Sequence, residues 1–139
     1  MRTELLFLVL LVPLGACKDA AREETRTLFE AVTHFRLATD GEKHARITDI
    51  QRVTCSAKDV CDARDTCLRM AEEWDHSLTL RVTVKSTLDE IGQKTLSKDD
   101  PRAQALPSLL DESEAALNNA HTLARTCDEQ LSGVTARHR

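Results

Sequence analysis

Aromatic residues are scarce in this sequence. It contains no tyrosine, one tryptophan (Trp74) and three phenylalanines, so that aromatic residues make up 3% of the chain. A core with so few rings must be built from aliphatic side chains, which suits packed helices better than a β-sandwich or barrel. Four glycines and three prolines are also too few for the turns between many short strands. These shortages favour an all-helical fold.

Long apolar runs are missing as well, apart from one short run near the N-terminus. Residues 5–12 are all leucine, valine or phenylalanine. The run falls well short of the ~20 apolar residues that a membrane-spanning helix needs. Arg2 precedes it, and Pro13 and the small residues Gly15 and Ala16 follow it. This order is typical of a signal peptide, so we expect residues 1–16 to be removed on export.

The end of this segment carries a lipidation motif. Leu14 to Cys17 read Leu-Gly-Ala-Cys, which closely resembles the lipobox of bacterial lipoproteins. The resemblance implies diacylglycerol on the Cys17 thiol, cleavage before Cys17 and fatty acylation, such as palmitate, of the new amino terminus. Two or more acyl chains anchor a protein stably, at ~0.8 kcal/mol per buried CH₂. Lys18 follows the cysteine, which in the sorting pattern of enteric lipoproteins favours the outer membrane over the inner one.

The charge pattern argues against several classes of function. The side chains carry a net charge of −4, which does not suit nucleic-acid binding. Carboxylates cluster at 72–75 and at 111–114, but in a chain with 30% charged residues such clusters are typical of solvated helix faces. There is no Gly-x-Ser-x-Gly motif and no glycine-rich phosphate loop. The sequence therefore predicts neither an enzyme nor a bound cofactor.

Helical spacing of apolar residues divides the mature chain into three arms. After a short spacer at 17–21, the first arm runs to about residue 54 and is broken near Gly41, which we expect to act as a left-handed cap. The second arm spans 56–96 and opens with Ser56 in a capping-box pattern. Its apolar stripe consists of Val60, Ala63, Cys67, Met70, Trp74, Val84, Leu88 and Ile91.

The third arm begins at Asp100-Pro101, a cap followed by proline in the first helical position. After Pro107 the main helix carries an apolar residue every seven positions, namely Leu110, Leu117, Ala124 and Leu131. Gly133 should end it and leave a polar tail at 133–139. The sequence thus predicts a helical domain at 22–132, an up-down bundle of about three long helical arms linked by disulfides.

One segment within the second arm has a conflicting pattern. Residues 78–85 alternate apolar and polar side chains and are rich in β-branched residues, which taken alone indicates a strand. A single strand would leave its backbone groups without partners, and no other segment alternates in this way. We therefore interpret residues 78–85 as helix, with a strand that pairs with another chain as the alternative.

Four cysteines remain once Cys17 is lipidated, and an even number outside the cytoplasm indicates disulfides. Cys61 and Cys67 lie ~9 Å apart along one helix, too far to be bridged. Folding the second arm back against the third brings Cys127 close to the level of Cys67. Cys55 then remains for Cys61. We therefore predict the disulfides Cys67–Cys127 and Cys55–Cys61.

Two histidines are weak candidates for a binding site. His76 and His121 lie at similar distances from the expected turn at 97–100, so the two helices could bring them together as a metal-binding or pH-sensitive pair. No third ligand is evident, and we interpret both as residues of the polar boundary. Together with Met70 they would be the first residues to examine in a small-molecule, haem or metal-binding bundle.

The sequence as a whole favours a non-catalytic lipoprotein of the cell envelope. We expect it to be tethered to a membrane, facing the periplasm or the surface, and to bind another envelope protein or contribute to envelope structure. The alternative is a periplasmic helical bundle that binds a small molecule, haem or metal. The mature domain resembles no named family.

Overall fold

The computed structural model describes residues 16–139, so residues 1–15 of the signal peptide expected at 1–16 lie outside the described part of the chain. The described chain consists of helices and connecting turns, with no strand between residues 16 and 139. The helices are α1 (Ala16–Leu37), α2 (Asp40–Gln51), α3 (Lys58–Gly92), α4 (Pro101–Gln104) and α5 (Leu106–Arg137). The all-helical prediction is confirmed. Residues 78–85 lie inside α3, where helical packing against α5 overrides their local preference for a strand.

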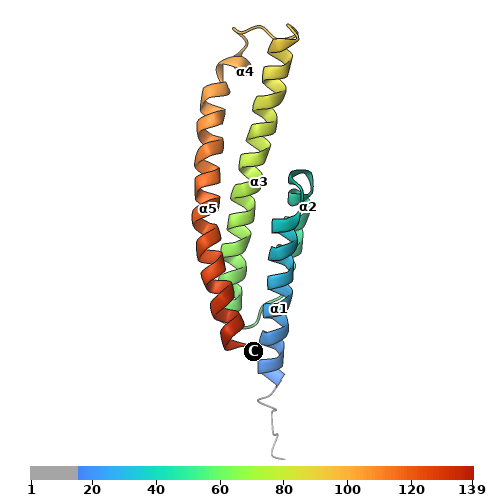
Figure 1. The fold of residues 1–139 in the computed structure, drawn as a ribbon, viewed down its shortest axis with the longest axis vertical. Helices are drawn as coiled ribbons and strands as arrows, with labels where there is room; N and C mark the ends of the chain where they lie inside the picture. The colour runs from blue at the N-terminus through green and yellow to red at the C-terminus, as the bar shows by residue number, and fades with distance from the viewer. Residues whose placement is uncertain (1–15) are drawn as a thin grey trace, which may run out of the picture.

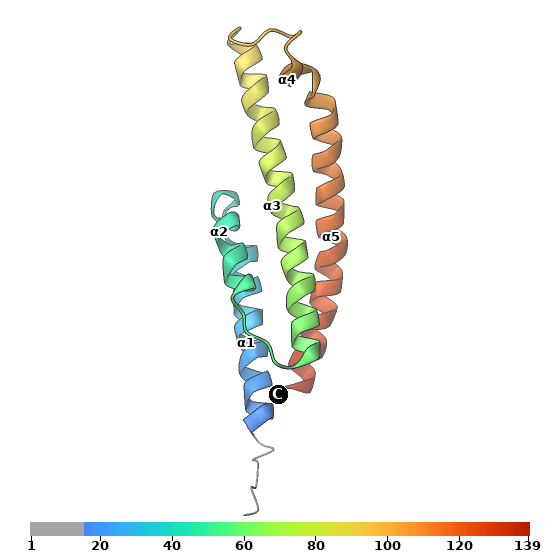
Figure 2. The same ribbon diagram turned by 180° about the vertical axis from the view of Figure 1, so that it is seen from behind.

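The helices form two antiparallel pairs of unequal length. The long helices α3 and α5 lie side by side along the molecule and are joined at one end through α4, while α1 and α2 pack beside one half of this pair (Figures 1 and 2). The first described turn of α1 and the end of α5 lie at the same end of the molecule (Figure 1). We call this end the base. The prediction of long helical arms in an up-down order is confirmed.

The break in the first arm differs in detail from the prediction. It falls at Ala38 and Thr39, and α2 turns back along α1 to form a hairpin (Figure 1). The amide and hydroxyl of Thr39 both donate to Oε2 of Glu42, at 3.1 and 2.8 Å. These bonds hold the pKa of the Glu42 carboxyl below its usual value. Gly41 is not a left-handed cap, because it lies within the first turn of α2 and has no positive φ.

The start of α3 also departs from the sequence pattern. Ala57, rather than Ser56, occupies the N-cap position. The amide and hydroxyl of Ser56 instead donate to the Glu24 carboxylate of α1, at 2.9 and 2.8 Å. Partial burial raises the pKa of Glu24. The hydrogen bonds from Ser56 and Ala57 lower this pKa by more than burial raises it, so the net shift is downward. Ser56 therefore ties the loop before α3 to α1. The cap expected at Asp100 is present, since its carboxylate accepts from the amide of Arg102 at 2.9 Å.

The end of α5 is longer than predicted. The helix passes Gly133 and continues to Arg137, within the segment expected to be a polar tail. Val134 is fully buried, and the side chains of Arg137 and His138 contact the carboxylate of Asp59 at 2.8 and 3.1 Å. Burial of Val134 and this link to α3 keep the last turns helical. At the start of the mature chain, the expected spacer at 17–21 belongs to α1.

The core lies in the half of the molecule where all four long elements meet. Its fully or almost fully buried residues include Leu28, Val32, Phe35, Ile50, Val60, Ala63, Cys67, Met70, Cys127 and Val134. Beyond the turn between α1 and α2, the helices α3 and α5 have only each other and α4 as neighbours within residues 16–139 (Figure 2). We call this part, residues 78–117, the distal arm. Leu88 and Leu110 were expected in the buried stripe but are 52% and 51% exposed there, because neither α1 nor α2 reaches far enough to cover them.

Candidate functional site

The predicted disulfides are both present. Cys67–Cys127 joins α3 to α5 with a Cα separation of 5.0 Å, and Cys55–Cys61 joins the preceding loop to the first turn of α3 with 5.3 Å. Cys67 and Cys127 are fully buried in the core. The side chain of Cys17, the predicted lipidation site, lies outside the part of the chain whose side chains are described.

The two candidate histidines have different neighbours. His76 Nε2 lies 3.1 Å from Glu112 Oε1, whereas the ring of His121 packs edge-on against Trp74 with centroids 5.6 Å apart. Met70, the third residue singled out from the sequence, is buried. Among residues 19–139, whose side chains are described, no group of three His, Cys, Asp or Glu could hold a metal ion. The structure therefore does not bring His76, His121 and Met70 together as one site.

A third histidine, which no sequence pattern singled out, links two helices. His44 Nδ1 on α2 lies 2.8 Å from Asp75 Oδ2 on α3. The hydrogen bond to Asp75 and its negative charge raise the pKa of His44 above its ordinary value. The two residues are 31 positions apart, and their contact depends on how α2 folds back along α1. Only the three-dimensional packing could reveal this pair.

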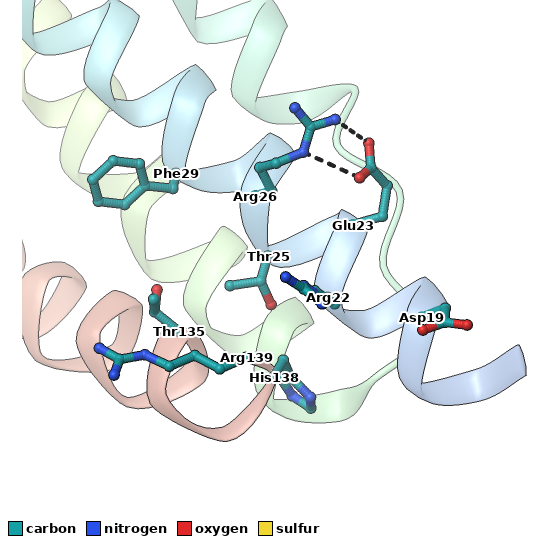
Figure 3. Close-up of a pocket in the computed structure, with 9 residues that line it drawn as sticks. All are labelled: Asp19, Arg22, Glu23, Thr25, Arg26, Phe29, Thr135, His138 and Arg139. Carbon is teal, nitrogen blue, oxygen red and sulfur yellow. Dashed lines mark hydrogen bonds and ion pairs between the residues drawn. The ribbon is translucent and has the colours of Figure 1, made fainter. Parts of the chain in front are cut away.

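A large cavity opens at the base, between the first turns of α1 and the end of α5. Its volume is about 860 Å³, and we call it the basal pocket. Figure 3 shows the lining residues on α1 and on the last residues of the chain. They are Asp19, Arg22, Glu23, Thr25, Arg26, Phe29, Thr135, His138 and Arg139. The sequence could not indicate this pocket, because its two sides come from opposite ends of the mature chain.

Ion pairs fix several of the charged groups around the basal pocket. Arg26 lies between Glu23 and Glu30, and its guanidinium donates two bonds to the Glu23 carboxylate (Figure 3). The bond from Arg26 lowers the pKa of Glu23. Arg22 and Arg139 form no ion pair with a described residue. Phe29 adds an apolar surface that is 54% exposed. The pocket thus combines exposed guanidinium groups with an aromatic ring.

Four carboxyl groups among the described residues have a lowered pKa, and in each case hydrogen bonds to the carboxylate contribute to the shift. Asp59 is an example, because partial burial raises its pKa but the bonds from Arg137 and His138 more than offset this and lower it. Every carboxyl group with a shifted pKa among residues 16–139, namely Glu23, Glu24, Glu42 and Asp59, is shifted downward.

Comparisons of this chain with protein-family models, with curated proteins and with solved structures give no match. Between residues 16 and 139, none of the helices combines the length and apolar character required to cross a bilayer.

Proposed function

We propose that this protein is a non-catalytic lipoprotein of the bacterial cell envelope, anchored through Cys17 and acting by binding another envelope protein or by supporting envelope structure. The observation that carries the proposal is the Leu-Gly-Ala-Cys motif directly after a short apolar run. The two disulfides support it in two ways. They are typical of an oxidising compartment, and they use four of the five cysteines, which leaves Cys17 for the lipid.

The position of the anchor gives the domain an orientation. Because α1 begins at Ala16, lipid on Cys17 would hold the base of the bundle against the bilayer, with no long stalk between them. The distal arm would then point away from the membrane (Figure 1). At 1.5 Å per residue, the 35 residues of α3 extend for about 50 Å.

The distal arm is the surface best suited to meet a protein partner. It carries three of the large hydrophobic side chains that are more than half exposed, namely Val82 (69%), Leu88 (52%) and Leu110 (51%). Val82 and Leu88 lie on α3 and Leu110 lies on α5, and a partner protein that packs against the distal arm would cover this apolar surface. We expect the partner to be another envelope protein, reached from an anchor in the outer membrane.

The anchor is tested by replacing Cys17 with serine in the full-length chain. We expect Cys17→Ser to abolish labelling by radioactive palmitate and to release the protein from the membrane fraction, because the acyl chains are the proposed attachment. Cys55→Ser with Cys61→Ser is the control and should still be labelled. A Cys17→Ser variant that stays in the membrane fraction would show another attachment and contradict the proposal.

The interaction role is tested by affinity capture from envelopes with the anchor intact. A variant with Val82, Leu88 and Leu110 each changed to glutamine is compared with the natural protein. A partner that depends on the distal arm should be recovered with the natural protein and lost with the variant. A matched variant with Phe29→Gln at the base should keep it. If the natural protein, the triple glutamine variant and the Phe29→Gln variant all recover the same proteins, the distal arm is not the binding surface.

A further inference from the structure

One buried cation in the core has no carboxylate partner. Lys43 of α2 is only 6% exposed. Its ammonium group donates to the carbonyl oxygens of Phe35 and Arg36 at 3.1 and 3.4 Å, and it lies 5.0 and 5.6 Å from the ring centroids of Phe35 and Trp74. No ion pair joins it to an acidic side chain among residues 16–139. Lysine is almost never buried to this extent without a pairing charge.

Lys43 also lines a cavity of about 270 Å³. Phe35, Met70, Trp74 and Ala124 form its apolar walls, and Arg36 and Asp128 complete the lining. The Arg36 guanidinium is bound to the Asp128 carboxylate at 2.6 Å, so these two charges largely cancel. Lys43 therefore leaves the lining with one positive charge in excess. We call this cavity the Lys43 pocket.

We propose that the Lys43 pocket binds a small organic monoanion, with a carboxylate on the Lys43 ammonium and an apolar body against Met70 and Trp74. The single excess charge selects one negative charge, and the aromatic and thioether walls select an apolar body. Ligand pockets in proteins usually start at about 300 Å³, so only a small molecule fits here. This proposal concerns the bundle itself and does not depend on the anchor at Cys17.

Trp74 provides a direct measurement, because it is the only tryptophan in the chain and it lines the pocket. The full chain is titrated with octanoate and with benzoate while Trp74 fluorescence is recorded. Each acid is compared with its neutral amide, octanamide or benzamide, which has nearly the same shape. We expect a saturable change with at least one acid and binding weaker by about tenfold or more for its amide, because the amide forms no charge-assisted bond with Lys43.

Three variants test whether the acid binds in the Lys43 pocket and not elsewhere on the protein. Lys43→Met should weaken binding of the acid by about tenfold or more, and Lys43→Arg should retain most of it. Asp128→Asn keeps Lys43 in place, raises the positive charge of the pocket and should tighten binding, so it tests the proposal even if Lys43→Met fails to fold. As a control, Cys17→Ser should bind as the natural protein does, which distinguishes this site from the proposed anchor.

Three results would overturn the proposal. The first is the absence of a saturable fluorescence change with either acid. The second is equal binding of an acid and its amide, which would show that Lys43 does not recognise the charge. The third is weaker binding by Asp128→Asn, since that substitution increases the positive charge of the pocket.

Discussion

At the scale of single residues, Lys43 of α2 caps the C-terminal end of α1 and so links the two helices. Its ammonium group binds the carbonyl oxygens of Phe35 and Arg36, which belong to the last turn of α1 and lack partners within the helix. Lys43→Ala would leave these carbonyls buried without a donor and remove the contacts with the rings of Phe35 and Trp74. We expect a loss of about 2 kcal/mol in the free energy of unfolding, measured by urea denaturation.

Lys58 is the matched control for this substitution. It forms an ion pair with Asp62 one turn further along α3, but its side chain is 88% exposed. Solvent screens such a pair, so Lys58→Ala should cost much less than Lys43→Ala. Equal losses for the two variants would mean that Lys43 does not cap α1 in solution.

His44 and Asp75 give the stability of the domain a dependence on pH. The pKa of His44 is raised above 6.5 by its bond to Asp75, so the pair stabilises the fold most fully below pH 6.5. Its contribution is lost as the pH rises through the higher pKa of the folded state. NMR titration should show that Asp75→Asn returns the pKa of His44 toward 6.5. An unchanged pKa in this variant would show that Asp75 is not the cause.

At the scale of helices, a polar contact fixes the register of α3 against α5. The hydroxyl of Ser77 donates to the Ser113 carbonyl at 2.9 Å, the hydroxyl of Ser113 donates to the Ser77 carbonyl at 3.2 Å, and both residues are buried. Changing either serine to alanine should lower the free energy of unfolding by about 1 kcal/mol. The double variant should lose less than the sum of the two single losses, because the hydroxyls also contact each other at 3.1 Å.

A double-mutant cycle based on urea denaturation measures this coupling. Ser86→Ala, an exposed serine of α3, is the control and should change the stability little. Strictly additive losses for Ser77 and Ser113 would show that the two hydroxyls act independently. The contact would then not specify how the two helices align.

The same helices show which features could be predicted from the sequence. The seven-residue repeat and Asp100-Pro101 indicated where α3 and α5 face each other, and this was enough to pair Cys67 with Cys127. Leu88 has the same spacing as the buried residues, yet it is exposed. Its burial depends on how far α1 and α2 extend along α3, which no local pattern specifies. The basal pocket and the His44–Asp75 contact were unpredictable for the same reason, since each joins distant segments.

At the scale of the whole molecule, the two halves of the α3–α5 pair have unequal support. Near the base, α1 and α2 cover the pair and both disulfides lie there, whereas the distal arm is a pair of helices without this cover. Fewer buried contacts allow local unfolding at lower cost. We expect amides in 82–92 and 106–112 to exchange hydrogen faster than those in 60–75. Mass spectrometry of the exchanging protein measures this, and uniform protection along α3 would contradict it.

The placement of the first described turn of α1 and the end of α5 at the same end of the bundle matters for anyone who labels this protein (Figure 1). A tag fused after Arg139 would emerge beside the residues that follow Cys17. On an anchored molecule it would be crowded against the lipid surface and shielded from antibodies or resins. The exposed turn around Lys98, at the opposite end between α3 and α4, is the better site for an inserted epitope. If the proposed anchor holds, an epitope placed there would be displayed far above the bilayer, and its accessibility on intact and permeabilised cells would report which side of the envelope the protein faces.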